Sequence, residues 1–78
     1  MIEYQITKEP CYYIDLGYYT AYGITAFSFC GGKKVPVVHI SDVCLNRKKA
    51  SALVRLCNEN HVAPIHLTEI VEDFIASY

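Results

Sequence analysis

The sequence lacks an excess of charge of either sign. Its 78 residues carry seven Lys and Arg against eight Asp and Glu, which gives a formal net charge of -1. Proteins that bind nucleic acid through general electrostatics carry a clear positive excess, because contacts to phosphates supply most of their affinity. The charge balance therefore argues against that class of protein.

The sequence also lacks an export signal and a stretch suited to a membrane. Polar residues follow Met1 almost at once, whereas a signal peptide needs basic, apolar and small-residue regions in that order. Residues 16–32 carry no charge, but they include all four glycines of the chain and only just reach spanning length. We expect a cytoplasmic protein without a membrane-spanning segment.

Closely spaced cysteine pairs and a glycine-rich phosphate loop are missing as well. The cysteines stand at positions 11, 30, 44 and 57, and without an export signal we expect free thiols that are buried as small apolar side chains. Gly31 and Gly32 precede an expected strand rather than a helix, so they do not form a phosphate-binding loop. We expect no cofactor.

Apolar side chains are plentiful. They make up 53% of the chain, against 19% charged residues, which indicates a folded protein. Residues 1–78 are too few to divide between two cores, so we expect one domain. Apolar burial at about 25 cal/mol per Å² roughly equals the cost of ordering so short a chain, so a monomer is expected to be marginally stable.

The first half of the chain predicts strands. Apolar and polar residues alternate over residues 2–7, the period of a half-buried strand. Glu9-Pro10 is expected to interrupt this strand, and residues 12–14 to form a second short strand or an edge segment before a turn at residues 15–17.

A long central strand is predicted from Tyr19 to Cys30, with Gly23 marking a bulge or a close backbone approach. Gly31-Gly32 tolerates positive φ and predicts a hairpin turn. The chain is expected to return over residues 35–41, and Pro36 must lie at the strand start or on an unpaired edge because it cannot donate a hydrogen bond.

Helical periodicity begins after Leu45. The first helix is predicted over residues 47–59, with Asn46 as its N-cap and with Asn58, Asn60 and His61 suited to its end. A second helix is predicted after Pro64. Its apolar face comprises Leu67, Ile70, Val71, Phe74, Ile75 and Tyr78. The order of elements predicts an α+β domain, an antiparallel meander of three or four strands followed by two C-terminal helices packed on one face.

Four segments carry a family resemblance: Tyr22-Gly23-Ile24, Leu53 to Asn58, Pro64 to Leu67 and Val71 to Ile75. They resemble a family of short bacterial proteins catalogued as a domain of unknown function. The resemblance implies a small cytoplasmic bacterial protein. It brings no activity, cofactor or site residue.

Tyrosines are concentrated at one end of the chain. Six of the seven fall within residues 4–22, and a sheet covered on one face leaves the other to water or to a partner. Tyrosine suits interfaces because its ring is apolar and its hydroxyl still forms hydrogen bonds. We therefore expect a non-catalytic module that contacts a second copy or another protein. The candidate contact residues are Tyr12, Tyr13, Tyr18 and Tyr19.

The first helix opens with three basic residues, Arg47, Lys48 and Lys49, where the helix dipole favours acidic ones. They are interpreted as a solvated basic turn or as a docking surface for an anion, for nucleic acid or for the acidic residues of another copy's second helix. The alternative function is therefore a small anion-binding or nucleic-acid-binding regulator.

Cys57, His61 and His66 have a spacing that resembles a metal site. Structural zinc sites usually have four ligands, often with Cys-x-x-Cys pairs. The alternative places Cys57 in the core and leaves His66 to satisfy main-chain groups. A Cys-His nucleophile would also need a substrate cleft for which so small a domain has little room, so we expect neither a metal site nor an enzyme.

Overall fold

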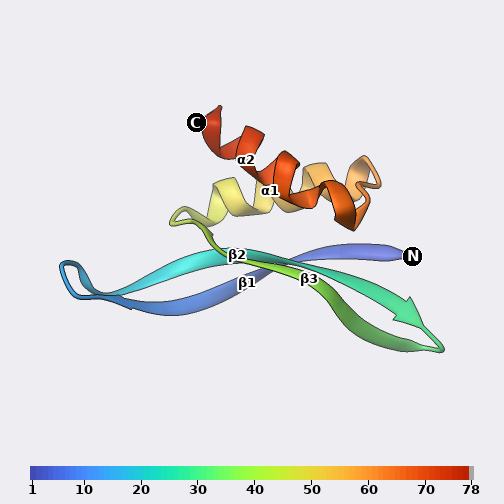
Figure 1. The fold of residues 1–78 in the computed structure, drawn as a ribbon, viewed down its shortest axis with the longest axis horizontal. Helices are drawn as coiled ribbons and strands as arrows, with labels where there is room; N and C mark the ends of the chain where they lie inside the picture. Colours follow the sequence, from blue (N-terminus) through green and yellow to red (C-terminus); the bar gives the residue numbers. More distant parts are fainter. Residues whose placement is uncertain (78) are drawn as a thin grey trace.

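The computed structural model describes residues 1–77, which form one antiparallel sheet and two helices (Figure 1). The sheet has three strands in the order β1-β2-β3, so β2 is central. This confirms the α+β meander with two C-terminal helices; Tyr78, expected on the second helix, lies outside the described residues. The elements are β1 (Ile2–Tyr13), β2 (Gly17–Cys30), β3 (Lys33–Cys44), α1 (Arg47–Glu59), the 3-10 turn η1 (Pro64–His66) and α2 (Leu67–Ala76).

Glycines shape both hairpin turns. Gly31 and Gly32 have φ values of +57° and +80°, which confirms the predicted two-residue turn between β2 and β3. In the first hairpin, Leu16 N donates to Tyr13 O at 3.0 Å, and Gly17 follows with a φ of +72°. This is a three-residue loop that closes with glycine in the left-handed conformation.

Pro10 does not interrupt β1, so that expectation is wrong. The register pairs Pro10 with Thr20, and Phe29 N donates to Met1 O at 3.2 Å. Odd-numbered residues of β1 therefore exchange hydrogen bonds with β2, and even-numbered residues direct their main-chain groups to the open edge. Pro10 lies on that edge, where its missing N–H removes no ladder bond. Pro36 lies on β3, the other edge strand, as predicted.

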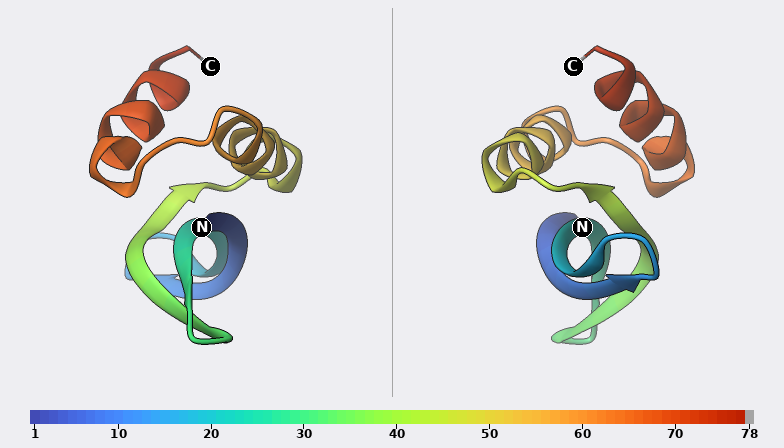
Figure 2. Two further views of the ribbon diagram at one scale, coloured as in Figure 1. Left: turned by 90° about the vertical axis from the view of Figure 1, so that its right-hand side faces the viewer. Right: turned by 90° about the vertical axis from the view of Figure 1, so that its left-hand side faces the viewer.

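Both helices lie over one side of the strongly curled sheet (Figure 2). The N-cap at Asn46 and the bounds of α1 are confirmed: the Asn46 side chain accepts from Lys49 N. The left-handed residue after α1 is His61, with a φ of +50°. The largest fully buried side chains come from the sheet, from α1 and from the start of α2, and they are Tyr4, Ile24, Leu53, Leu67 and Cys57.

Two side chains connect β1 to the helical layer. The Tyr4 hydroxyl donates to Val62 O at 2.6 Å, and burial, followed by the nearby Cys57, raises the pKa of Tyr4. Asn58 Oδ1 accepts from Tyr4 N at 2.8 Å, and Asn58 Nδ2 donates to Tyr4 O at 3.0 Å. The Asn58 amide thus satisfies both outward main-chain groups of a residue on an edge strand.

The sheet is longer than the helices that cover it. β3 ends at Cys44 opposite Tyr22, whereas β1 and β2 continue as a two-stranded ribbon to their turn (Figure 1). We call residues 10–21 the hairpin arm. The molecule measures 43 × 27 × 19 Å, with a radius of gyration of 13.1 Å, against about 11.5 Å for a compact domain of this length.

Candidate functional site

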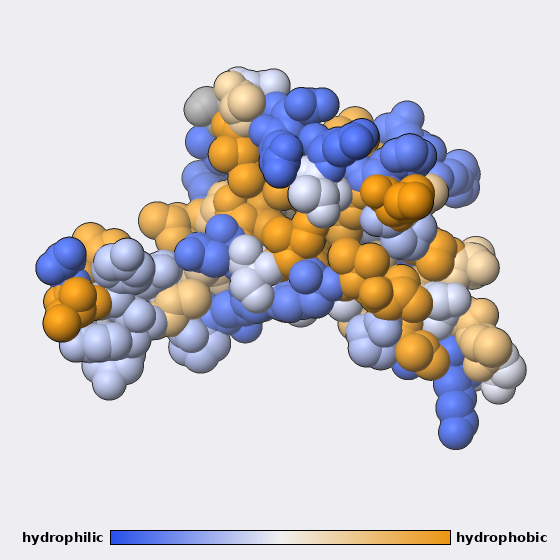
Figure 3. Space-filling model, in the orientation of Figure 1, coloured by the Kyte–Doolittle hydropathy of each residue, from blue (hydrophilic) through white to orange (hydrophobic). Residues whose placement is uncertain are grey.

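The tip of the hairpin arm exposes large side chains. Tyr18 is 88% exposed, and its ring lies 4.9 Å from that of Tyr12 between centroids. Figure 3 shows a small hydrophobic group among weakly hydrophilic side chains at this end of the molecule. We call the exposed residues the arm cluster, and they are Tyr12, Tyr13, Ile14, Leu16 and Tyr18, each more than half exposed.

Tyr19, the fourth tyrosine predicted to contact a partner, has a different environment. It is half-buried, and its hydroxyl donates to Asp42 Oδ2 at 3.4 Å. Burial, followed by the nearby Asp42 carboxylate, raises the pKa of Tyr19. Tyr19 therefore connects the base of the arm to the end of β3, while the other three tyrosines lie at the tip.

The basic residues of α1 divide between two places. Arg47 and Lys48 line an open hollow together with Ser51, Ala52 and Arg55. Lys49 lies elsewhere, beside the contact between β3 and α2. The predicted trio is therefore not brought together. Arg55 replaces Lys49 in the group, and the four-residue spacing of Arg47, Ser51 and Arg55 is the sequence signal that could have identified it.

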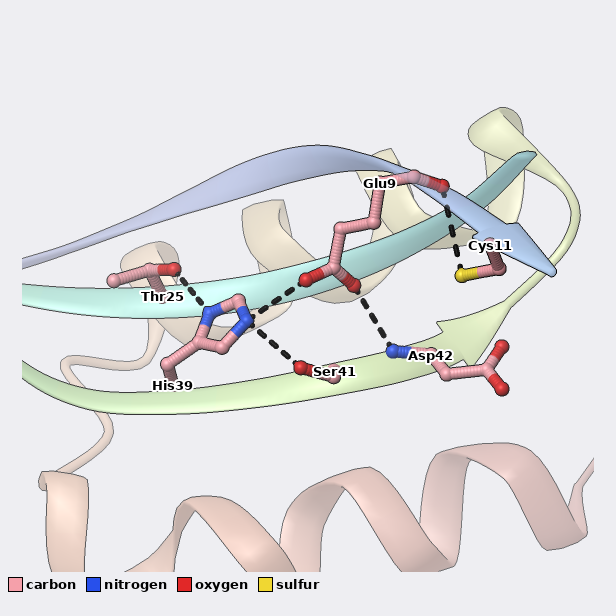
Figure 4. Close-up of polar contacts among 6 residues, drawn as sticks. All are labelled: Glu9, Cys11, Thr25, His39, Ser41 and Asp42. Carbon is pink, nitrogen blue, oxygen red and sulfur yellow. Dashed lines mark hydrogen bonds and ion pairs between the residues drawn. The ribbon is translucent and has the colours of Figure 1, made fainter.

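A polar cluster that sequence reasoning missed lies on the sheet (Figure 4). Glu9 Oε2 pairs with His39 Nε2 at 2.9 Å, and Glu9 Oε1 accepts from Asp42 N at 3.1 Å. His39 Nδ1 lies 2.7 Å from the Thr25 hydroxyl, and its Nε2 lies 3.0 Å from that of Ser41. We call these five residues the Glu9 clasp.

Gly23 makes the clasp possible. Glu9 is on β1 and His39 is on β3, so the carboxylate must cross β2, the strand between them. A Cβ at Gly23 would lie 2.7 Å from both Glu9 Oε1 and Ile40 O, closer than side chains tolerate. The bulge and close backbone approach predicted at Gly23 are both confirmed, since the β2–β3 register shifts between Tyr22 and Ile24.

The clasp joins residues of all three strands through hydrogen bonds. The order Thr25, His39, Glu9 matches nucleophile, base and acid, but Thr25 is only 5% exposed, so a substrate does not reach its hydroxyl. The hydrogen bond from Asp42 N has the largest effect and lowers the pKa of Glu9. Burial opposes it as the second-largest effect, and the hydrogen bond from His39 lowers the pKa further. The ionised carboxylate thus joins the two edge strands.

Cys57, His61 and His66, whose spacing resembles a metal site, do not form one cluster. Cys57 is fully buried in the core, and burial raises the pKa of its thiol, whereas His61 and His66 are exposed. Within residues 1–77, no three His, Cys, Asp or Glu side chains are placed to hold a metal ion. All four cysteines are free, and Cys30 is exposed, contrary to the expected burial.

The comparisons with known proteins identify a family. In the described part of the chain, neither helix combines the length and the apolar character that crossing a membrane requires. Searches of curated proteins and of solved structures gave no significant match. A family model described as a family of unknown function matches residues 1–77, nearly the whole chain. The chain therefore belongs to the family of unknown function DUF6514.

Proposed function

We propose that this chain is a non-catalytic cytoplasmic interaction module that forms a homodimer through its hairpin arm. The observation that carries the proposal is the arm cluster, in which three tyrosines, an isoleucine and a leucine lie more than half exposed on one projecting ribbon. Exposed apolar and aromatic side chains that gather in one place are typical of protein interfaces.

The surface area of the chain supports a second copy as the partner. Its accessible surface is 5538 Å², against about 4,800 Å² for a compact monomer of this mass. The excess is roughly 700 Å². Each partner in a standard interface buries about 800 Å², which is close to this value. An arm that packs against a second copy would therefore restore an ordinary ratio of surface to volume.

Charge is compatible with self-association. The arm carries a single charged residue, Asp15, which lies in the turn. Two copies that meet through their arms would bring few like charges together, and the net charge of -1 on the whole chain adds little repulsion. Charge therefore presents no barrier to a symmetric contact between arms.

Sedimentation equilibrium tests the proposal. We expect the wild type to be dimeric at micromolar concentration and the double variant Ile14→Ser/Tyr18→Ser to shift toward monomer. Ile65→Ser is the matched control, because Ile65 is 84% exposed, as Ile14 is at 83%, but lies in η1 outside the arm. A wild type that stays monomeric and still unfolds cooperatively at high temperature would contradict the homodimer.

The hollow on α1 favours a second candidate function, the binding of an anion. Arg47, Lys48 and Arg55 line it together with Ser51 and Ala52, and none of the described residues that line it is acidic. Titration with inorganic phosphate and with an oligonucleotide at low salt tests this function. We expect Arg47→Glu/Lys48→Glu to abolish binding, while the control Lys8→Glu/Lys33→Glu, with the same change in net charge, retains it. Equal affinity of the two variants would exclude this site.

A further inference from the structure

The hairpin arm has one strand edge without a neighbour. β2 pairs with β1 from Gly17 to Ser28, but its pairing with β3 stops at Tyr22. From Gly17 to Ala21, no strand of the described residues 1–77 lies on the β3 side of β2. This part of a central strand is therefore an edge strand.

The free main-chain groups on this edge belong to Tyr18 and Thr20. In β2 the odd-numbered residues face β1, as the bond from Phe29 N to Met1 O establishes. The N–H and C=O of Tyr18 and Thr20 therefore point away from β1. Both residues are exposed, and no strand of residues 1–77 is paired with them on that side.

The opposite edge of the arm offers fewer donors to a partner strand. There the outward position across from Thr20 is Pro10, which has no N–H to offer. Tyr12 is the other outward residue of β1 within the arm, so that edge offers a partner strand one N–H, where the β2 side offers two. An isolated two-stranded ribbon is marginally stable in water, so the arm gains stability from one further strand on that side.

We propose that the β2 edge of the arm pairs antiparallel with the same edge of a second copy. Tyr18 of each copy then lies opposite Thr20 of the other copy, which makes two equivalent pairs. This inference rests on the proposed homodimer and specifies its interface. Each of the two pairs exchanges both of its N–H···O=C bonds. The two arms then form one four-stranded ribbon around a two-fold axis.

A second copy suits this edge better than an unrelated strand. Several antiparallel registers are compatible with a two-fold axis. The one that pairs the outward groups of both Tyr18 and Thr20 places Tyr19 of each copy at the centre, and the donors of one copy then face the acceptors of the other. The same register places the Tyr18 side chain of each copy on the four-stranded ribbon that the two arms form. The Tyr18 residue is 88% exposed in the single chain, and in the dimer its ring would cover part of the other copy's arm.

A proline substitution tests the pairing directly. Thr20→Pro removes an outward N–H that the arm itself does not use, because Thr20 lies opposite Pro10. Lys8→Pro is the control, since Lys8 occupies an outward position on β1, opposite Tyr22 and just beyond the arm. We expect Thr20→Pro to weaken dimerisation by about tenfold or more in Kd, since each copy loses one hydrogen bond, and Lys8→Pro to leave it unchanged.

Hydrogen exchange of the wild type gives a second readout that does not depend on the folding of a variant. The amides of Tyr18 and Thr20 should become protected as the protein concentration rises through the dimerisation range. A wild type that remains monomeric would overturn both this inference and the homodimer. A dimer in which these amides stay unprotected, or in which Thr20→Pro associates as tightly as Lys8→Pro, would overturn the strand pairing alone.

Discussion

The covered part of the sheet and the hairpin arm are built from the same two strands, but their tyrosines have opposite environments. Tyr4 is 2% exposed under the helices, whereas Tyr18 is 88% exposed at the other end of the strands. The residue type is the same in both places. What differs is coverage, because the helical layer and β3 both stop short of the arm.

This difference shows where the stability of the single chain comes from. The covered region buries its apolar side chains against α1 and α2, so changes there should alter the free energy of unfolding. The arm holds its large side chains in water, so changes there should alter association instead. Four substitutions, taken from the largest expected effect to the smallest, can break or sharpen this contrast.

Leu53→Ala should have the largest effect. Leu53 lies on α1 and is 1% exposed, so its truncation leaves a cavity between helix and sheet that should cost about 2–5 kcal/mol. Urea unfolding monitored by circular dichroism measures the loss. Leu56→Ala on the same helix is the control, because Leu56 is 43% exposed. Equal losses in the two variants would mean that α1 does not cover the sheet as described.

Asn58→Ala should have the next largest effect, about 1–3 kcal/mol, because it leaves Tyr4 N and Tyr4 O without their partners. Thermal unfolding measures this loss. The matched change is Asn60→Ala, since the Asn60 side chain donates only to Leu56 O within its own helix. If Asn60→Ala proved as costly as Asn58→Ala, the connection to β1 would not be what stabilises this end of the sheet.

Glu9→Gln should cost at most about 1 kcal/mol at neutral pH, and its effect should depend on pH. Because the pKa of Glu9 is lower in the folded chain than the unfolded value of about 4.3, the ionised carboxylate stabilises the fold above that value. This stabilisation is lost as the pH falls through the folded pKa.

The free energies of unfolding of wild type and Glu9→Gln should therefore converge in acid, as equilibrium unfolding at pH 7 and pH 3 would measure. Glu72→Gln, a change at an exposed position on α2, should give a difference that varies less with pH. A gap between wild type and Glu9→Gln that does not narrow at all from pH 7 to pH 3 would count against the clasp.

Ile14→Ser should have the smallest effect on the single chain, less than about 0.5 kcal/mol. Its side chain is 83% exposed, so little contact is lost when the protein is dilute enough to be monomeric. Chemical unfolding at that dilution is the measurement. Ile24→Ser provides the contrast in the covered region. Ile24 is 1% exposed, so this change should strongly lower the free energy of unfolding. A large effect of Ile14→Ser would show that the arm contributes to the monomer core.

The elements that local sequence determines were predicted well. The N-cap at Asn46, the apolar periodicity of α1 and the paired glycines of the second hairpin each act within a few residues. The interruption at Glu9-Pro10 was wrong for a physical reason. Whether a proline breaks a strand depends on which side its nitrogen faces, and that side is set by pairing with β2 rather than by residues near Pro10.

The Glu9 clasp could not be predicted because its members meet through irregular pairing. A regular ladder from the Gly31-Gly32 turn would place Val38 opposite Thr25, with its side chain on the same face. The register shift between Ala26 and Phe27 places His39 there instead. Strand periodicity alone contains no signal for such a shift. The half-burial of Tyr19 was missed for a similar reason, since its Asp42 partner lies on β3.

The pair of bonds between Asn58 and Tyr4 has a consequence for how α1 is seated. Burial of apolar side chains is non-directional and would tolerate several positions of a helix along the sheet. The Asn58 amide is different, because one atom must meet a donor and the other an acceptor of the same residue. Sliding α1 by a single turn, about 5.4 Å, would break both bonds at once. One side chain thus selects a single alignment of the helix, whereas the apolar face of the helix alone would be compatible with several.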